Sequence, residues 1–469
     1  MLNPLTSDFV THLAEMLPSD TIRTASPAYL EEPRGRYHGQ GTHVALPRTV
    51  EDVSSIVAAC NDARIGVVPF GGGTGLVGGQ VAIDTPPPLI LSLERMNAIR
   101  EVYPYENVLI AEAGAILANV QAAAEEVDRL FPLSLASEGS CRIGGNLATN
   151  AGGLNVLRYG NTRDLCLGLE VVLPSGQIWN GLTRLRKDNT GFDLRNLMIG
   201  SEGALGVITA ATLKLFPRPA ERGAAVMVVP DPTAALKLLN LAQSIAAGEV
   251  SAFELIHRTG LEFLSEKLPE VRLPFDDAPK WMVLVDLGTS AGRTPDALLE
   301  TLFEEGLAAG LVMDGLIAHS NAQREQLWAV RERIPEANKA IGSIVSHDVS
   351  LPLGSIADFI TEGRKRLAAI GDMRINCFGH LGDGNLHFNA FSAKGKSRDA
   401  YDDKRSAIQK CVHDLVTEMG GSISAEHGIG RLKAADLAHY GDAGKLAAMR
   451  AIKDALDPNC IMNPGAVLA

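Results

Sequence analysis

The chain has 469 residues and a formal net charge of −12, and aromatic residues make up only 5% of it. This length exceeds what one hydrophobic core usually serves, so we expect two large domains or three smaller ones. The acidic balance and the lack of a Lys/Arg-rich stripe exclude nucleic acid as an expected partner. No stretch approaches the ~20 apolar residues of a transmembrane helix. The six cysteines show no CxxC spacing, which predicts reduced thiols in a protein of the cytoplasm.

The first part of the chain predicts a helix, a short strand, and then a second helix that is capped by Thr49 and runs to about Arg64. A strand at Gly66–Phe70 leads into Pro69–Gly79, which is the richest glycine run of the sequence. Backbone amides without side chains around them form a nest for an anion. We therefore expect this loop to bind a phosphate or pyrophosphate, the alternative being a merely flexible connection.

The same loop matches a dinucleotide fingerprint, Gly73-x-Gly75-x-x-Gly78, and Glu94 at the end of a strand at Leu89–Leu93 supplies the expected acid. That fingerprint requires a helix directly after its last glycine. Here the chain continues toward three consecutive prolines, which cannot donate backbone hydrogen bonds within a helix. The sequence therefore predicts a phosphate site of another architecture.

A second glycine-rich region spans Ser137–Gly153 and continues to Asp164. Small residues at this density let the backbone approach a flat ligand closely, and Asn146, Thr149 and Asn150 offer hydrogen bonds to its polar edge. A loop that only packs on a sheet is the alternative. A strand at Gly168–Leu173 follows. A third glycine-rich region then ends at Thr209.

From about Glu221 the pattern changes to strands and helices with fewer glycines, which predicts an antiparallel sheet covered by helices. The expected fold class is α+β, with a first domain at 1–220, a second at 221–455 and a tail at 456–469 that packs back on the first. The predicted strands of the second domain are 224–229, 280–287, 346–351 and 422–425, and the predicted helices end near 247, 309, 340, 370 and 419.

Histidines and a carboxylate cluster around glycine turns near the C-terminus. Asp383-Gly384 is a hairpin signal, so His380 and His387 are expected at the two ends of one tight turn. Glu426 can supply a third ligand, and this donor set suits zinc or a similar divalent metal with an open, catalytic position. His427 remains as a candidate base. A single histidine here would more often be structural, but four such groups in two clusters favour a metal site.

Six segments in this order resemble one enzyme family. They are Pro69–Gly79, Ser137–Gly153, Gly200–Gly203, His380–Asn389, Glu426-His427 and Pro458–Gly465. Together they are similar to the FAD-linked oxidases of the vanillyl-alcohol oxidase type, in the branch of D-lactate dehydrogenases, D-2-hydroxyglutarate dehydrogenases and the FAD subunits of glycolate oxidase. The resemblance covers essentially the whole chain. It implies a two-part FAD-binding domain of the PCMH type in 1–220 and an α+β cap domain with an antiparallel sheet.

The resemblance also assigns roles to residues. His380, His387 and Glu426 match the family's metal ligands, and His427 matches its catalytic base. Arg331 matches the arginine that holds the substrate carboxylate, and Asn389 matches a substrate contact. The residues that it places at the FAD are Pro69, Gly71, Gly72, Gly73, Thr74, Gly75, Gly78, Gly79, Ser137, Gly139, Gly144, Gly145, Asn146, Thr149, Asn150, Gly153, Tyr159, Gly160, Glu202, Gly203, Gly206, Val207, Ile208 and Asn463.

Two positions depart from the 2-hydroxyglutarate enzymes, which have a threonine and a lysine where this chain has Pro335 and Ser346. Neither can hold a second carboxylate by charge, so we expect a D-lactate-like substrate with a short or uncharged side chain. His347, one position from Ser346, or Arg333 could replace the lysine and restore a preference for the dicarboxylate. Ala204 replaces the family's usual threonine near the cofactor.

The expected function is oxidation of a D-2-hydroxy acid to the 2-oxo acid with FAD and a divalent metal. The loop Gly71–Gly79 contains no histidine or cysteine, so the FAD is expected to be non-covalent. The expected partners are an electron acceptor (a quinone, an electron-transfer flavoprotein or a cytochrome) and a second copy in a homodimer. A zinc hydrolase, a non-catalytic flavin subunit, including that of a glycolate oxidase complex, and an oxygen-using sugar or alcohol oxidase remain as alternatives.

Overall fold

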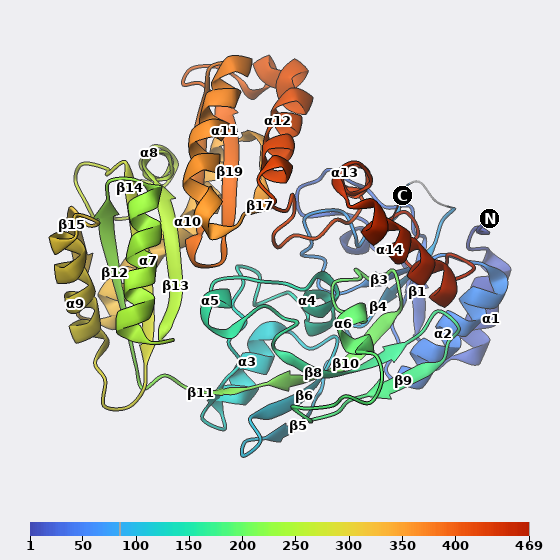
Figure 1. The fold of residues 1–469 in the computed structure, drawn as a ribbon. Helices are drawn as coiled ribbons and strands as arrows, with labels where there is room; N and C mark the ends of the chain where they lie inside the picture. Colours follow the sequence, from blue (N-terminus) through green and yellow to red (C-terminus); the bar gives the residue numbers. More distant parts are fainter. Residues whose placement is uncertain (84–85, 469) are drawn as a thin grey trace. The chain divides into compact units, whose positions relative to one another are not determined.

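The computed structural model describes residues 1–83 and 86–468, and the chain divides into two compact units (Figure 1). Unit 1 comprises Met1–Gly153, Gly160–Arg218 and Glu426–Ala469, and unit 2 comprises Leu154–Tyr159 and Pro219–Ala425. Within the described ranges, no helix combines the length and the apolar character that crossing a membrane requires. The C-terminal residues thus belong with the N-terminal part of the chain.

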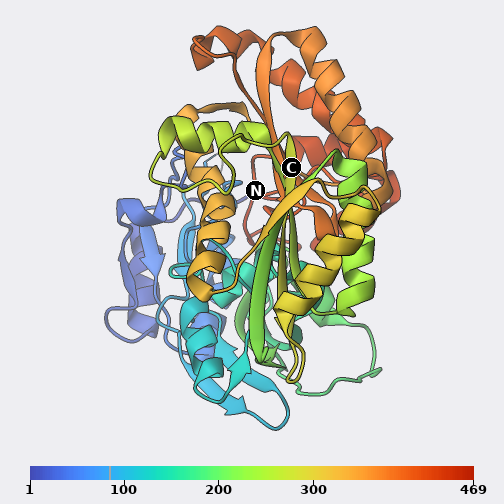
Figure 2. The same ribbon diagram turned by 90° about the vertical axis from the view of Figure 1, so that its left-hand side faces the viewer.

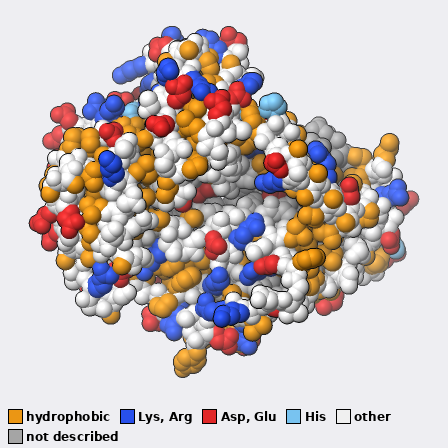
Figure 3. All heavy atoms as spheres, in the orientation of Figure 1, with side chains coloured by type: hydrophobic (Ala, Val, Ile, Leu, Met, Phe, Trp, Pro, Cys, Tyr) orange, Lys and Arg blue, Asp and Glu red, His pale blue; other side chains and the backbone are white. Residues whose placement is uncertain are grey.

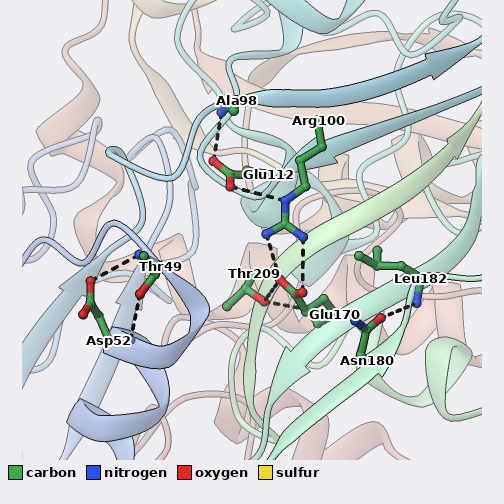
Figure 4. A network of polar contacts seen from close by, with 9 residues as sticks. All are labelled: Thr49, Asp52, Ala98, Arg100, Glu112, Glu170, Asn180, Leu182 and Thr209. Carbon is green, nitrogen blue, oxygen red and sulfur yellow. Dashed lines mark hydrogen bonds and ion pairs between the residues drawn. The ribbon is translucent and has the colours of Figure 1, made fainter.

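Unit 1 contains a four-stranded sheet of order β1-β2-β4-β3, in which β4 pairs in parallel with both β2 and β3, and β1 pairs antiparallel with β2. Its strands are β1 (Ile22–Thr24), β2 (His43–Ala45), β3 (Val67–Phe70) and β4 (Leu89–Ser92). Helix α2 (Val50–Ala63) begins at Thr49, whose hydroxyl accepts the Asp52 N–H while the Asp52 carboxylate accepts the Thr49 N–H (Figure 4). This capping box confirms the predicted start of the helix.

The glycine loop follows β3 and leads to β4 without a helix in its described part, residues 80–83 and 86–88. Asp84 and Thr85 of the proline-flanked segment lie outside the described residues. A dinucleotide fold would place a crossover helix here. The described residues therefore agree with a phosphate site of another kind.

The second sheet of unit 1 is antiparallel, with the order β5-β6-β10-β8-β9. Arg100 on β5 pairs with Glu170 on β8 through two bonds of 3.0 and 3.2 Å and with Glu112 on β6 at 3.3 Å (Figure 4). The Thr209 hydroxyl of β10 donates to the buried Glu170 carboxylate at 2.9 Å. A buried carboxylate needs such partners, so the network fixes four strands in register. The strands are β5 (Ile99–Tyr103), β6 (Val108–Glu112), β8 (Cys166–Val172), β9 (Ile178–Gly181) and β10 (Val207–Lys214).

Short helices and one small strand pair complete unit 1. The helices are α1 (Ser7–Met16), α3 (Leu117–Glu125), α4 (Ile143–Thr149), α6 (Leu194–Met198), α13 (Ala434–Tyr440) and α14 (Ala443–Leu456), with a 3₁₀ turn at Pro27–Tyr29. The strand pair is β7 (Arg129–Leu130) with β11 (Phe216–Pro217).

Unit 2 is built on one antiparallel sheet of order β15-β12-β14-β13-β18-β19-β16, with β17 also paired to β19. Helices cover both faces, with α8 and α10 on one and α7 and α9 on the other (Figure 2). The strands β12, β13 and β14 are therefore buried at almost every residue. The strands are β12 (Glu221–Val229), β13 (Val250–His257), β14 (Trp281–Thr289), β15 (Asp314–Ile317), β16 (Ser343–Val345), β17 (Asp348–Ser350), β18 (Met373–His380) and β19 (Asn385–Ser392).

The helices of unit 2 pack through apolar residues spaced along their inner faces. Val330 and Ile334 of α10 join Ile256 and Phe378 of the sheet in one buried cluster, and Phe359 of α11 meets Phe388 of β19 edge-on at 5.1 Å. The helices are α5 (Val156–Tyr159), α7 (Pro232–Ala246), α8 (Arg258–Lys267), α9 (Pro295–Ala308), α10 (Asn321–Ile341), α11 (Ile356–Ile370) and α12 (Arg405–Glu418), with 3₁₀ turns at Leu353–Ser355, Leu381–Asp383 and Arg398–Lys404.

The α+β architecture and most predicted elements are confirmed. The predicted strand at 422–425 is wrong, because Ser422 forms only a single bridge with Ser350. The predicted helix that ends near 419 begins at Arg405, after a 3₁₀ turn at Arg398–Lys404. Strand β13 has no counterpart among the predicted elements, since it is buried on both faces and lacks the alternating pattern of a half-exposed strand.

Basic and acidic side chains are mixed over the face drawn in Figure 3. The chain carries more acidic than basic residues overall. On this face, the described side chains form no extended positive stripe of the kind that follows a phosphate backbone.

Candidate functional site

Unit 1 contains a cavity of about 480 Å³, within the usual range for a cofactor pocket. Its wall is mainly backbone and small side chains. It comes from the loop after β3, the region around α4, the turn before β10, and β10 itself, together with Glu426 and His427. An elongated ligand with phosphate groups fits such a wall, because many peptide groups can approach it closely.

Glycine is required in this wall for steric reasons. A Cβ at Gly72 would lie 2.4 Å from the Ser140 carbonyl oxygen, and one at Gly71 would lie 3.3 Å from the Gly145 Cα. Gly73 adopts a φ of +70°, which L side chains rarely occupy. The two glycine-rich regions found in the sequence therefore pack backbone to backbone on one side of the cavity.

Most residues predicted to hold the FAD line this cavity. They are Pro69, Gly71, Gly72, Gly73, Thr74, Gly75, Gly79, Ser137, Gly144, Gly145, Asn146, Thr149, Glu202, Gly203, Gly206, Val207 and Ile208. Among the described residues, the other predicted ones are not part of its lining: Gly78, Gly139, Asn150, Gly153, Tyr159, Gly160 and Asn463.

Several of the residues outside the lining hold the wall in shape. The Asn463 amide donates to the carbonyl oxygens of Gly79 and Glu202 at 2.9 and 2.8 Å. Asn150 ends α4 in the left-handed conformation, and its side chain accepts the Arg163 N–H at 2.9 Å. These residues link the wall to neighbouring segments.

Gln80 was not predicted, although it lines the cavity. Its side-chain amide donates to the Gly75 carbonyl at 2.8 Å and so closes the glycine loop on itself. A glutamine at the end of a glycine run, able to reach back five residues, is the signal in the sequence that could have identified it.

The segment that carries Glu426 and His427 is fixed to the cavity wall. Glu426 accepts the Gly153 N–H at 2.8 Å. The Glu202 carboxylate accepts the N–H groups of Ile429 and Gly430 at 2.7 and 2.8 Å. Burial raises the pKa of the Glu202 carboxyl, whereas these two amide bonds oppose that rise by favouring the charged form. The loop of His427 is thus held by direct bonds to the glycine-rich segments.

Unit 2 contains the two predicted histidine ligands on adjacent strands of one hairpin. The rings of His380, at the end of β18, and His387, on β19, lie with their centroids 5.9 Å apart. The connection is a four-residue turn that contains a 3₁₀ segment and ends at Gly384 with φ of +84°. The tight turn predicted at Asp383-Gly384 is thus a four-residue connection, and it brings the two predicted histidines together.

Arg331 and His380 share one buried carboxylate, which the sequence reasoning missed. Glu254 of β13 accepts from Arg331 Nε at 2.6 Å and bonds His380 Nδ1 at 2.5 Å. Burial raises the pKa of Glu254, but the nearby Arg331 guanidinium and the His380 imidazole lower it by more. The resulting pKa is about 2. Arg331 also stacks over the Phe378 ring at 4.9 Å. A charged residue within an otherwise apolar strand is the sequence signal for Glu254.

The remaining predicted substrate residues have other partners. The Asn389 side chain accepts the His347 N–H at 2.9 Å, and the His347 ring is buried, with Nδ1 2.8 Å from the Phe388 carbonyl and its centroid 5.6 Å from that of His413. Ser346 is exposed and bonds the Ser343 hydroxyl at 2.8 Å.

Arg333 bonds Glu336 and Glu270 at 2.6 and 2.8 Å. Pro335 is an exposed residue of α10. The structure thus gives Arg333 two carboxylate partners, and Pro335 has no polar side chain with which to bind a substrate.

The metal hypothesis passes a chemical test within unit 2. His380 has its Nδ1 bonded to a carboxylate, as is usual for histidines that coordinate a metal through the other nitrogen. Its neighbour His387 supplies a second imidazole. Glu426 and His427 belong to unit 1, so the full ligand set stays a prediction.

Comparison with known proteins identifies both parts of the chain. Residues 42–181 match the FAD binding domain family, and residues 218–467 match the C-terminal domain of FAD linked oxidases. The D-2-hydroxyglutarate dehydrogenase of Arabidopsis thaliana is 35% identical over 476 residues, covering 100% of this chain and 83% of the relative. The enzyme of the same name from Rattus norvegicus is 38% identical over 418 residues, covering 89% of this chain and 76% of the relative.

Among solved structures, p-cresol methylhydroxylase superposes with a TM-score of 0.76 at 17% identity, covering 100% of this chain and 98% of that one. This likeness shows the fold, which is the PCMH-type arrangement expected from the motifs. The family match spans more than half of the chain, and its FAD-binding part includes both glycine-rich regions of the cavity wall. The chain therefore belongs to the FAD-linked oxidases, a family of flavoenzymes.

Proposed function

We propose that this protein is an FAD- and metal-dependent dehydrogenase that oxidises a D-2-hydroxy acid to the corresponding 2-oxo acid. The observation that carries the proposal is the buried group of Arg331, Glu254 and His380, with His387 beside it. In this group, Arg331 is a cation that can bind the carboxylate of a substrate. His380 and His387 provide two imidazoles that can bind a metal. The relatives from A. thaliana and R. norvegicus are named as dehydrogenases of such a substrate.

In this proposal FAD supplies the hydride acceptor, and a divalent metal such as zinc, held by His380, His387 and Glu426, supplies Lewis acidity at the hydroxyl. Arg331 uses Nε for Glu254, and its two Nη groups bind the substrate carboxylate in a forked, charge-assisted contact. His427 accepts the hydroxyl proton on its imidazole. Asn389 orients the substrate.

Non-covalent FAD is the first expected result. The side-chain-bearing members of the lining between Gly73 and Gly79 are Thr74, Leu76 and Val77, so this loop offers no histidine or cysteine that could attach to a flavin. Acid precipitation of the purified protein should release the yellow colour into the supernatant. Colour that stays in the pellet would contradict this prediction.

For substrate choice we propose a D-lactate-like acid with a short or uncharged side chain. A dicarboxylate needs a partner for its second carboxylate, because burying an unpaired charge is costly. Ser346 is neutral and exposed, and the two residues that could replace it have other partners: His347 is buried against Phe388, and Arg333 is paired with two glutamates. D-2-hydroxyglutarate is the second candidate, because the relatives carry its name.

The ratio of kcat/KM for D-lactate and D-2-hydroxyglutarate tests this choice. We expect the wild type to prefer D-lactate and Ser346→Lys to shift the ratio toward the dicarboxylate by about tenfold, equivalent to roughly 1.4 kcal/mol. Ser397→Lys adds the same charge at another exposed serine of unit 2 and should leave the ratio unchanged. A wild-type preference of tenfold or more for the dicarboxylate would reject the D-lactate-like choice.

We further propose that the electrons pass to a quinone, an electron-transfer flavoprotein or a cytochrome, and that the protein acts as a homodimer in the cytoplasm. The two relatives are named as mitochondrial. Fractionation of the source cells and size measurement of the purified protein test the location and the dimer.

A further inference from the structure

Glu254 lies at the centre of unit 2, where it is 0% exposed. It is the direct cross-strand neighbour of His380, since β13 and β18 pair in the register Glu254 to His380. Arg331 reaches the same carboxylate from helix α10, which covers this face of the sheet. A buried carboxylate is costly unless its oxygens are bonded, and here each oxygen has one charged or polar partner.

The bond to His380 determines which ring nitrogen carries a proton. An ionised carboxylate can only accept, so His380 Nδ1 must donate the hydrogen. The neutral ring then has its lone pair on Nε2, which is the form that binds a metal. The second oxygen of Glu254 accepts a hydrogen bond from Nε of Arg331. This bond fixes the plane of the Arg331 guanidinium and therefore the direction of its two Nη groups.

We propose that Glu254 is a positioning residue for both halves of the substrate site: it holds His380 in the tautomer that coordinates through Nε2, and it orients Arg331 toward the carboxylate of the hydroxy acid. This inference rests on the proposed function, because it assumes that His380 binds a metal and Arg331 the substrate. In this proposal Glu254 acts through His380 and Arg331, to which its two carboxylate oxygens are bonded.

Glu254→Gln provides a sharp test because its effect on the tautomer follows from hydrogen-bond chemistry. The guanidinium can only donate, so the amide oxygen of the glutamine must face Arg331. The amide NH₂ then faces His380 and requires Nδ1 to accept, which places the ring proton on Nε2. The shape of the site is retained, while the coordinating nitrogen is blocked.

Glu254→Asp makes the opposite change. It shortens the side chain but keeps a group that only accepts hydrogen bonds. A purely structural role would favour the isosteric glutamine over the shorter aspartate. If Glu254 fixes the tautomer, the aspartate variant should bind the metal more tightly than the glutamine variant.

Asp286 is a matched control on the neighbouring strand β14. It is also buried, and its carboxylate accepts from Arg324 at 2.8 Å and from the Trp328 ring N–H at 2.7 Å. Its bonds therefore resemble those of Glu254, with an indole in place of the imidazole. Asp286→Asn removes a comparable buried charge without touching a predicted ligand.

The experiment titrates zinc alone into the FAD-loaded, metal-stripped protein and measures its dissociation constant, together with the FAD content and the thermal midpoint. We expect Glu254→Gln to weaken zinc binding by ~10–100-fold, Glu254→Asp to weaken it less, and Asp286→Asn to leave it within about twofold at unchanged FAD content. Wild-type zinc affinity in Glu254→Gln, or an equal loss in Asp286→Asn, would overturn the role of Glu254. Failure of the wild type to bind any zinc would instead refute the proposed metal site on which the inference rests.

Discussion

Replacement of His427 by alanine is expected to lower kcat by ~10²–10⁴-fold, the usual contribution of a general base. The residue lies in the cavity wall, on a loop whose backbone is fixed by the Glu202 carboxylate and by the Val77 carbonyl, which accepts the Arg431 N–H at 2.9 Å. Because these bonds involve neither the imidazole nor its Cβ, the loop should keep its conformation in the variant. Steady-state kinetics with a D-2-hydroxy acid and an artificial acceptor measure the effect.

The same His427→Ala protein should keep its FAD and its metal. His439→Ala, at an exposed histidine of α13 in the same unit, is the matched control and should retain the wild-type kcat. Loss of the metal together with the rate would assign His427 to the ligand set and contradict its role as the base.

Removal of the metal is expected to lower turnover by ~10²-fold or more. A metal that polarises the hydroxyl contributes several kcal/mol of charge stabilisation, and each 1.36 kcal/mol corresponds to about a factor of ten. Chelation should remove about one metal ion per chain, as one three-residue ligand set predicts. Elemental analysis before and after chelation measures this loss. Addition of zinc should restore the rate.

His387→Ala should reproduce the effect of chelation, since it removes one of the two adjacent imidazoles. His319→Ala changes an exposed histidine of unit 2 that pairs with Asp296 and should retain metal and activity. If the metal-free protein turns over at the original rate, the ion has no part in the reaction. The FAD spectrum should be unchanged in His387→Ala and in His319→Ala.

The sequence was most informative where residue type alone restricts the backbone. Gly72 and Gly73 line the cavity that the glycine run predicted, at positions where a close carbonyl or a positive φ favours glycine. Helix α2 could be placed because its capping box is local, between Thr49 and Asp52. The hairpin of His380 and His387 was also predicted, since its two strands are contiguous in the chain.

The tertiary structure decided what depends on partners far apart in the sequence. Glu254 lies 77 residues from Arg331 and 126 from His380, so only the pairing of β13 with β18 shows that one carboxylate serves both. The same holds for Glu202, whose amide partners lie 227 and 228 residues away. No local pattern specifies such pairs, because they arise from strand order and helix packing.

The sequence by itself determined the family and the two glycine-rich regions that line the cavity, and it named the histidines as candidates, because these inferences depend on residue chemistry and short spacings. It left open how each side chain is used. In the tertiary structure the His347 ring contacts the Phe388 carbonyl, and Arg333 pairs with Glu270 and Glu336. His380 bonds the carboxylate of Glu254. The physical reason is that burial makes an unpaired polar group costly, so the partners that the fold supplies decide where each group points.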